Sequence, residues 1–261
     1  MEASSLTYRK LPGWIKGLIS FTILIGVWQL GTSLLSIPPY LLPSPSLVLR
    51  TFIEQRVLLV KQLGPTLLEA SAGFVFGNCA AILIATWFVR STAAERALLP
   101  LALSLRSVPI VAITPVITLV LGRGYAATIS IVGLVTFFPT LVNTTKGLRS
   151  VSKEAEELLS ILAATKQQSF KLLRIPSALP YLLSAMRITA PSSVLGALVA
   201  EWVATDRGLG YLMLDSQTQW RIGLLWATIT LTTLLAVVAF GLVGLAERYL
   251  LSWHESTVRR G

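Results

Sequence analysis

The sequence has few of the residues that enzymes use for catalysis and metal binding. It contains one cysteine, Cys79, and one histidine, His254. A single cysteine can form neither a disulfide within the chain nor a cysteine cluster around a metal. Cys79 lies inside an apolar run, so we expect it to be a small packing residue. His254 lies in the terminal tail, which argues against a histidine-based metal site or triad, and we expect neither a metal site nor catalytic residues.

Several sequence motifs are also absent. No G-x-x-x-x-G-K-[ST] phosphate-binding loop occurs, so this chain cannot be an ATP-hydrolysing subunit. No G-x-S-x-G elbow or H-E-x-x-H pair occurs. There is no convincing internal repeat, which weakens an interpretation as a transporter built from inverted repeats.

Charged residues are scarce. They make up 13% of the chain, whereas 54% is hydrophobic and the mean hydropathy is +0.72. A soluble domain has about 25% charged residues. Several charge-free runs reach the roughly 20 residues that cross a bilayer. No small-residue cleavage site follows the first run, so it is read as a span and not as a signal peptide. The composition predicts an all-α polytopic membrane protein.

The apolar runs predict about six transmembrane helices. They cover Gly17–Leu35, Ala70–Val89, Ala97–Gly122, Gly124–Thr145, Leu182–Ala204 and Ile222–Ala246. Arg106, Pro109 and Pro115 interrupt the third, where we expect a kink or a partly interfacial start. The prolines of residues 37–53 indicate a loop outside the membrane, and residues 205–220 form a second outer loop.

The basic residues are distributed unevenly between the two sides that these spans define. The outer segments hold six, namely Arg50, Arg56, Lys61, Arg123, Arg207 and Arg221. The inner segments hold sixteen, namely Arg9, Lys10, Lys16, Arg90, Arg96, Arg106, Lys146, Arg149, Lys153, Lys166, Lys171, Arg174, Arg187, Arg248, Arg259 and Arg260. This asymmetry predicts that both termini are cytoplasmic. It explains the net charge of +10 without any nucleic acid.

Residues 150–181 are the longest polar interruption between apolar runs. Ser152 is a plausible N-cap, and the glutamates that follow it suit the positive end of a helix dipole. Thr165 and Gln168 have the spacing of a capping box, which predicts a second short helix. Pro176 and Pro180 lack the N–H of a continuing helix, so we expect them to end this helix or to begin the next element with a bend.

The first of these short helices has one apolar stripe. The positions fit a helical repeat of i, i+3, i+4 and i+7 and are Ala155, Leu158, Leu159 and Leu162. Two short amphipathic helices at a sharp angle between membrane spans would make a rigid projection. Such a projection suits docking into a groove on a soluble partner.

This segment resembles the cytoplasmic "EAA" loop of permease subunits of bacterial ATP-binding-cassette (ABC) importers. Counted back from Ile175 and Pro176, Phe170 matches the usual aromatic residue of that pattern, Ala163 its glycine and Glu157 its glutamate. The chain departs from the pattern because leucines replace the two alanines and Ala163 replaces the glycine, which in the family favours a left-handed turn.

Further segments extend the resemblance over about four-fifths of the chain in family order. They are LLPSPS, the proline-containing third span, FFPTLVNTTKGLRSV, IPSALP and AEWVATDRGLGYLM. They are most similar to permeases for aliphatic sulfonates, taurine, nitrate and bicarbonate, with those for pyrimidine-type vitamin precursors or riboflavin a close second. The resemblance implies a core transport domain at 61–250 containing the coupling loop 150–181, a preceding segment 1–60 with the first span, and a cytoplasmic tail at 251–261.

The resemblance also implies partners and a location. A type I ABC importer of the bacterial inner membrane pairs two permeases with two ATPase subunits, and an extracytoplasmic binding protein delivers the substrate. ATP and Mg are held by the ATPase, so the resemblance implies no cofactor in this chain. The residues that would dock into the ATPase are Glu157, Leu158, Leu159, Leu162, Ala163, Phe170 and Pro176.

Polar groups inside the spans are candidates for the translocation path. We expect Thr189, Ser192 and Ser193, in a broken part of the fifth span, to contribute to it, although small polar residues also serve in helix packing. Glu69 and Glu201, near the outer ends of spans, are further candidates, because an ionisable group within a span is costly in lipid.

Two other classes of protein remain alternatives. An ATP-independent secondary transporter or channel should carry coupling carboxylates in the middle of its spans, and the sequence places none there. An integral membrane enzyme needs catalytic residues clustered near one interface, which the absence of acid pairs and the lone tail histidine do not support.

Overall fold

The computed structural model describes residues 12–251, and this part of the chain contains helices and no β-strand. The predicted all-α fold is confirmed. The predictions that concern Arg9, Lys10, His254, Arg259, Arg260 and both terminal tails fall outside these residues.

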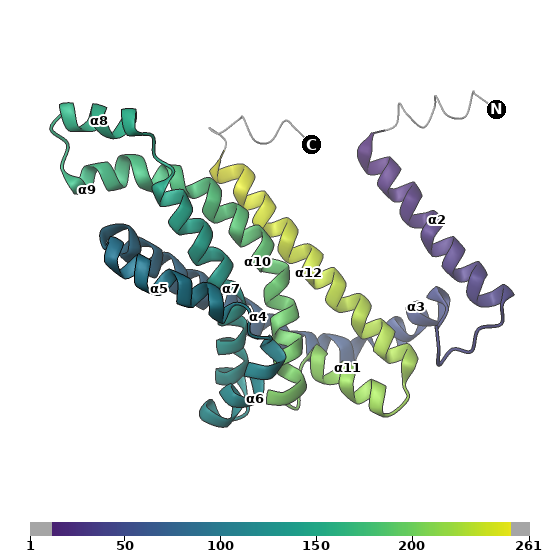
Figure 1. Cartoon of the computed structure of the whole chain (residues 1–261). Coiled ribbons are helices and arrows are strands. Elements are labelled where there is room, and N and C mark those ends of the chain that lie inside the picture. Colours follow the sequence, from purple (N-terminus) through teal and green to yellow (C-terminus); the bar gives the residue numbers. More distant parts are fainter. Residues whose placement is uncertain (1–11, 252–261) are drawn as a thin grey trace. The chain divides into compact units, whose positions relative to one another are not determined.

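The helices, labelled in Figure 1, alternate between long spans and short connecting segments. They are α2 (Gly13–Leu34), α3 (Pro45–Glu54), α4 (Arg56–Arg90), α5 (Thr92–Leu105), α6 (Ile110–Leu121), α7 (Tyr125–Arg149), α8 (Lys153–Ile161), α9 (Lys166–Ser169), the π-helical turn η1 (Phe170–Arg174), α10 (Ile175–Ala204), α11 (Leu209–Thr218) and α12 (Ile222–Leu250). Within residues 12–251, five helical stretches are long and apolar enough to cross a membrane, or six if the bent pair α5 and α6 counts as one span. The prediction of about six spans is confirmed.

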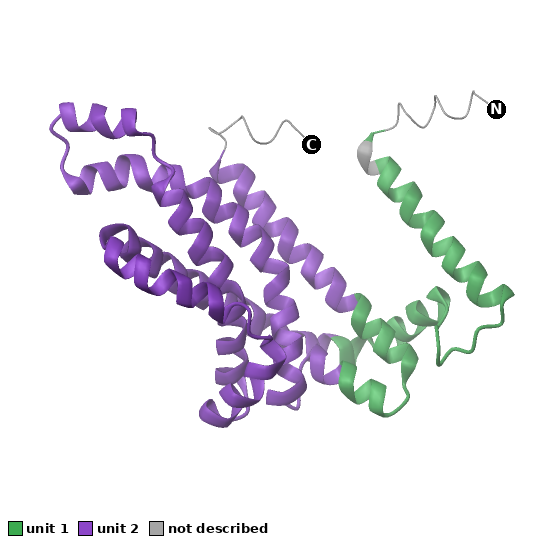
Figure 2. Ribbon diagram, viewed as in Figure 1, with its two compact units in different colours: residues 1–59, 213–230 green, residues 60–212, 231–261 purple. Residues whose placement is uncertain are grey.

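The chain divides into two compact units (Figure 2). The first comprises residues 1–59 and 213–230, and the second comprises residues 60–212 and 231–261. The second unit contains all the site residues proposed from the sequence.

The third predicted span is broken, as expected. α5 and α6 meet at an angle of 103° across residues 106–109. Pro109 is the N-cap of α6, where its missing N–H costs no helical hydrogen bond. Pro115 lies inside α6 and does not interrupt it, which differs from the expectation.

The second predicted span begins earlier than the sequence indicated. α4 starts at Arg56, not at Ala70, and continues through Pro65. At about 1.5 Å per residue its 35 residues extend over about 50 Å, more than the hydrocarbon thickness of about 30 Å. Glu69 therefore lies inside α4 and not at its first residue.

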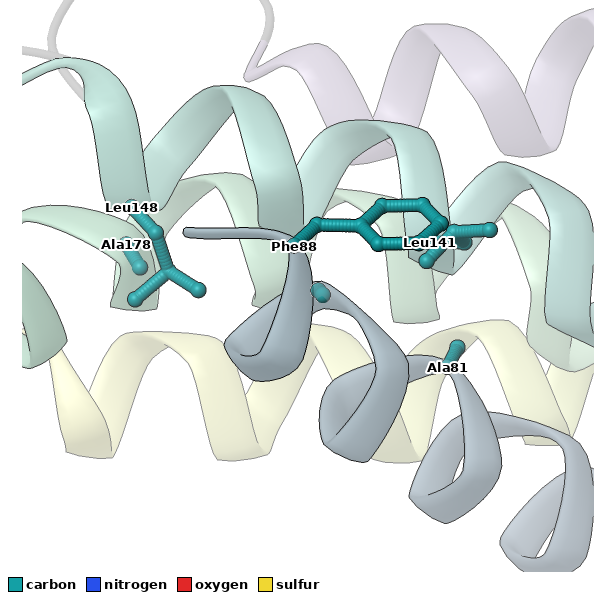
Figure 3. Packing of buried hydrophobic residues seen from close by; sticks show 6 residues of the cluster. Ala81, Phe88, Leu141, Leu148 and Ala178 are labelled. Carbon is teal, nitrogen blue, oxygen red and sulfur yellow. The ribbon is translucent and has the colours of Figure 1, made fainter. Parts of the chain in front are cut away.

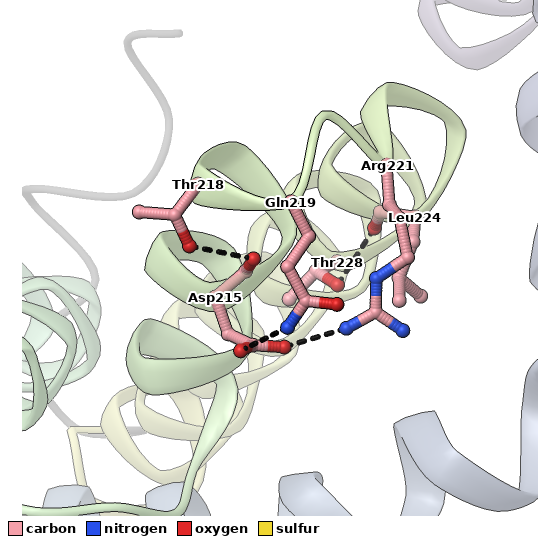
Figure 4. Close-up of polar contacts among 6 residues, drawn as sticks. All are labelled: Asp215, Thr218, Gln219, Arg221, Leu224 and Thr228. Carbon is pink, nitrogen blue, oxygen red and sulfur yellow. Dashed lines mark hydrogen bonds and ion pairs between the residues drawn. The ribbon is translucent and has the colours of Figure 1, made fainter.

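The two segments predicted to be outer loops contain short helices that were not expected. α3 begins because the Ser44 side chain accepts a hydrogen bond from the N–H of Leu47 at 3.3 Å, and Pro45 occupies the first helical position. Figure 4 shows the corner after α11, where the Asp215 carboxylate accepts from Gln219 and Arg221, each at 2.6 Å. These prolines and polar residues start and end helices, so reading them as loop alone was wrong.

The second unit is organised around α7 and α10, which pack along each other. A Cβ added to Gly147 of α7 would meet Ala178 and Tyr181 of α10 within about 3 Å, so the backbones approach closely there. Leu141 and Leu148 of α7 pack with α4 and α10 residues in a buried cluster (Figure 3). Its buried members are Ala81, Ala85, Phe88, Leu141, Leu148 and Ala178.

Cys79 does not belong to this core. It is exposed on α4, whereas Asn78 beside it is buried and accepts a hydrogen bond from Thr140 of α7 at 2.7 Å. The expectation that Cys79 packs inside the chain is wrong. The small residues that face α7 from α4 are Gly73 and Gly77, whose added Cβ atoms would collide with α7.

Candidate functional site

Residues 153–169, comprising α8, α9 and the turn between them, form a projection that we call the knob. Ser152 caps α8 by accepting from the N–H of Ala155 at 3.3 Å. Thr165 and Gln168 form the reciprocal capping box of α9, with bonds of 3.3 Å from Gln168 N and 2.8 Å from Thr165 N. Both predicted helix starts are confirmed.

The turn of the knob has a left-handed residue at Ala163, with a φ of 53°. Its N–H donates to the carbonyl of Ser160 at 3.0 Å, and the N–H of Ala164 donates to the carbonyl of Leu159 at 2.9 Å, so these two carbonyls near the end of α8 are satisfied. The left-handed conformation costs a non-glycine residue roughly 1–2 kcal/mol. The structure thus keeps the turn expected of glycine at this position, although the residue is alanine.

The apolar stripe of α8 divides into two faces. Ala155 and Leu159 are half-buried. The side chains on the other face are exposed, with fractions of 57% for Leu158, 81% for Ile161 and 67% for Leu162. Sequence reasoning missed Ile161, although its spacing from Leu158 is i, i+3. Three neighbouring exposed aliphatic residues on a charged helix are the part of the knob best suited to contact another protein.

An ion pair joins α8 of the knob to η1, the turn that precedes α10. Arg174 of η1 donates to Glu156 of α8 at 2.5 Å and to the carbonyl oxygen of Leu148 of α7 at 3.1 Å. Phe170 packs against the buried cluster around Phe88, and the Arg90 guanidinium lies 5.5 Å from its ring centroid. Glu156 and Phe170 therefore hold the knob in place.

The predicted docking residue Glu157 has a different environment from Glu156. It is exposed, and within residues 12–251 it makes no ion pair. Its carboxylate is free to meet a cation from another protein. Its role in docking stays a prediction.

The prolines that follow the knob do not separate it from the fifth span. Pro176 lies in the first turn of α10, so it begins the next element, which was one of the two expectations, whereas Pro180 lies inside α10 and ends no helix. In η1 the N–H of Ile175 bonds to the carbonyl of Phe170, one residue further back than in an α-helix. This π-turn accommodates Pro176, which has no N–H to donate. Residues 166–204 therefore form one helical stretch of 39 residues.

At the other end of this stretch, Glu201 is fully buried and holds the connection to α11. Its Oε1 accepts from the Thr66 hydroxyl of α4 at 2.6 Å, and its Oε2 accepts from the N–H of Gly210 at 2.5 Å. Gln62 accepts from the N–H of Gly208, and Thr66 accepts from the N–H of Leu209, both at 2.8 Å. We call residues 208–210 the GLG segment.

The geometry of the GLG segment requires both of its glycines. Gly208 has a φ of 100°, which disfavours any residue with a side chain. A Cβ added to Gly208 would overlap the Glu201 carboxyl group, and one added to Gly210 would overlap the backbone of Leu198. RGLG is part of the segment AEWVATDRGLGYLM, which resembles permeases of ABC importers. The structure gives the physical reason for the two glycines in it.

Glu69 is buried beside Glu201. The polar groups that interact with its carboxyl group are Glu201, Thr128 and Arg207. Both oxygens of Glu69 are buried, and neither has a hydrogen-bond partner among the residues described. A carboxyl group inside α4 with no donor is an exception that requires an explanation.

The remaining path candidates lie on α10, which is unbroken at Pro191, so the predicted break is wrong there too. Thr189, Ser192 and Ser193 each donate their hydroxyl hydrogen to a carbonyl of the preceding turn, at 3.3, 2.9 and 2.7 Å. Thr189 and Ser193 are buried and Ser192 is half-buried. These bonds are typical of hydroxyl groups in helix packing, and a role in the path stays a prediction.

Comparisons with known proteins place this arrangement in a wider group. The family described as "Binding-protein-dependent transport system inner membrane component" matches residues 77–251. The chain is 34% identical to the formylaminopyrimidine transport permease protein ThiX of Halalkalibacterium halodurans, over 90% of this chain and 94% of that protein. It is 30% identical to the riboflavin transport system permease protein RibX of Chloroflexus aurantiacus, over 91% and 90%.

A third relative is the putative aliphatic sulfonates transport permease protein SsuC of Bacillus subtilis, 30% identical over 95% of this chain and 91% of that one. Among solved structures, an inward-facing conformation of the MetNI methionine ABC transporter matches with a TM-score of 0.65. It covers 75% of this chain and 97% of that chain at 17% identity, a likeness of fold.

Proposed function

Because the chain belongs to the family of binding-protein-dependent transport system inner membrane components, we propose that it works as one of two permease copies driven by two ATPase subunits. The chain is a multi-pass inner-membrane permease subunit of an ABC importer. ATP and Mg would be bound by the ATPase.

The substrate that we propose is a small polar solute or an organic anion. The relatives are named for formylaminopyrimidine, riboflavin and aliphatic sulfonates. The chain is more similar to the first than to the third, so a pyrimidine-type precursor and a sulfonate both remain in the proposed class. An extracytoplasmic binding protein would deliver it.

The alternative function, an ATP-independent secondary transporter or channel, is disfavoured by the family to which the chain belongs. Glu69 of α4 and Glu201 of α10 form a buried pair of carboxyl groups. The statement that the chain contains no acid pair, made from the sequence, is therefore wrong.

A second permease copy is supported by the exposed apolar face of α6. Val116, Leu119 and Val120 are 61%, 86% and 75% exposed. Beside them lies a groove of about 470 Å³ between α4, α6 and α7, with Phe76 and Phe137 in its lining. A flat apolar helix face next to a groove, with small residues nearby, suits helix association within a membrane.

We propose that the knob docks into a cleft of the ATPase through Leu158, Ile161 and Leu162. α9 of the knob and α10 belong to one helical stretch, and Arg174 of that stretch pairs with Glu156 of α8 and donates to the Leu148 carbonyl of α7. Closure of the ATPase dimer would therefore move α10 as a rigid lever, since there is no flexible joint between residues 166 and 204. The bilayer-crossing helices would alternate between inward-open and outward-open arrangements. Both termini would lie in the cytoplasm, as the basic residues indicate.

Capture of the ATPase tests this proposal. The affinity-tagged chain would be co-expressed with the ATPase encoded beside it, extracted in detergent and analysed for bound ATPase. We expect equal numbers of the two subunits, and we expect Glu157→Lys to weaken retention because it reverses an exposed, unpaired charge. Glu154→Lys is the matched control on the same helix. A wild-type chain that retains no ATPase would overturn the proposal, whereas equal retention by all variants would remove Glu157 from the contact.

A further inference from the structure

The carboxyl groups of Glu69 and Glu201 face each other inside the protein, and both side chains are 0% exposed. Both oxygens of Glu201 already act as acceptors, one for Thr66 and one for Gly210. Neither oxygen of Glu69 receives a hydrogen from the described part of the chain. Two acceptors that face each other can form a hydrogen bond only if one of them carries a proton.

The neighbouring groups do not supply the missing donor or countercharge. The Thr128 hydroxyl donates to backbone carbonyls of its own helix at 3.1 and 3.4 Å. The Arg207 guanidinium, the positive group that interacts with Glu69, lies 4.4 Å from the ring centroid of Tyr125 and forms no ion pair with either glutamate. One positive charge cannot balance two buried carboxylates.

We propose that Glu69 and Glu201 form a proton-binding site that holds one proton between them. Glu69 carries the proton and donates it to Glu201, which remains the acceptor of the Thr66 and Gly210 hydrogen bonds. The pair then bears one negative charge near Arg207 instead of two. This state removes the repulsion between adjacent buried carboxylates, and it supplies a donor for the otherwise unsatisfied Glu69.

A metal cation in place of the proton fits the residues less well. Within residues 12–251, no group of three or more histidine, cysteine, aspartate or glutamate side chains is arranged to hold a metal ion. Both oxygens of Glu201 are already engaged by short hydrogen bonds from Thr66 and Gly210. A shared proton needs only one oxygen that carries it and one that accepts its hydrogen bond, and the pair provides both.

The shared proton affects how closely α4 and α10 pack where they hold the GLG segment. Loss of the proton would leave two charges in contact and would push α4 and α10 apart at the point where Gln62, Thr66 and Glu201 hold the segment. The protonated pair therefore stabilises the connection between α10 and α11. This inference concerns residues of the second unit only and does not depend on the proposed ATPase contact.

Infrared spectroscopy of the purified full-length chain at neutral pH tests the site. We expect the carbonyl stretching band of a protonated carboxylic acid, with a downshift in D₂O and a further shift when glutamate is labelled with ¹³C. Glu69→Gln should remove the band. The glutamine NH₂ then donates to Glu201, and no protonated carboxylic acid remains in the pair. Glu54→Gln, which alters an exposed glutamate paired with Arg50, should leave it unchanged.

A wild-type spectrum without a protonated-glutamate band would overturn the inference, and so would a band that survives in Glu69→Gln. Glu201→Gln gives a second reading if Glu69→Gln does not fold. In this variant too the band should disappear, because the glutamine NH₂ donates to Glu69, which then carries the single negative charge of the pair. An unchanged band in Glu201→Gln would also overturn the inference. If sodium or calcium ions stabilise the wild type and no such band is seen, the inference is overturned and the site holds a metal cation instead of a proton.

Discussion

Glu201→Ala is expected to destabilise the chain by about 3–5 kcal/mol, the cost of removing one partner from a buried charged network. The Thr66 hydroxyl and the Gly210 N–H lose their acceptor, and each bond is 2.6 Å or shorter in the native chain. Gly210 N–H would then be buried without a partner, which alone costs roughly 1–3 kcal/mol. The thermal midpoint of the detergent-solubilised chain, followed by size-exclusion chromatography after heating, measures the effect.

Two variants separate the network from the mere loss of a carboxylate. Glu54→Ala removes an exposed partner of Arg50 and should cost at most about 1 kcal/mol. Glu201→Gln keeps the volume and the acceptor for Thr66, but it places an NH₂ group against the N–H of Gly210. Its midpoint should fall between those of the wild type and Glu201→Ala. A Glu201→Ala chain as stable as Glu54→Ala would contradict the structural role of Glu201.

The second large effect is expected at the knob, for Ile161→Asp combined with Leu162→Asp. Both side chains are largely exposed, so the fold and thermal midpoint should be unchanged. Burial of one such side chain in an interface is worth roughly 1.5–3 kcal/mol. Losing two corresponds to about 3–6 kcal/mol, and thus to a loss of affinity for the ATPase of about two to four orders of magnitude.

The matched control for the knob is Gln167→Asp, which adds a carboxylate to α9 away from the exposed apolar face. This variant should bind the ATPase like the wild type. Titration of the purified ATPase against the chain in nanodiscs, followed by fluorescence anisotropy, gives the affinities. If the double variant binds as tightly as Gln167→Asp, the contact lies elsewhere.

Those parts of the fold that depend on hydropathy and local capping could be predicted from the sequence. The apolar runs indicated the spans, and Ser152, Thr165 and Gln168 gave the starts of α8 and α9 because their side chains bond to nearby backbone groups. The kink of the third span followed from Pro109. Each of these signals acts within a few residues of the chain.

The errors concern prolines whose effect depends on their surroundings. Pro65, Pro115, Pro180 and Pro191 all lie inside helices. In a membrane the alternative to helix is an unsatisfied backbone in lipid, so a helix continues through a proline that would end it in water. The continuity of the knob with α10 could not be seen for this reason, because η1 compensates for Pro176.

The candidate site was located only in part. Glu69 and Glu201 were recognised as unusual, but their contact joins α4 and α10 across a long sequence separation, and no local pattern reports it. Ile161 was missed because the apolar stripe was taken as one face, whereas contacts with the rest of the chain partly cover Leu159 and leave Ile161 exposed. The spacing of Leu158, Ile161 and Leu162 was available as a signal.

Site-specific crosslinking from the knob tests the central claim most directly. A photoreactive benzoylphenylalanine would replace Ile161 in the chain co-expressed with its neighbouring ATPase, and Ile188, an exposed residue on the side of α10, would be the control position. The account predicts a crosslink to the ATPase from position 161 and none from position 188. Absence of an ATPase crosslink at position 161, or equal crosslinking from both positions, would contradict the docking of the knob into the ATPase.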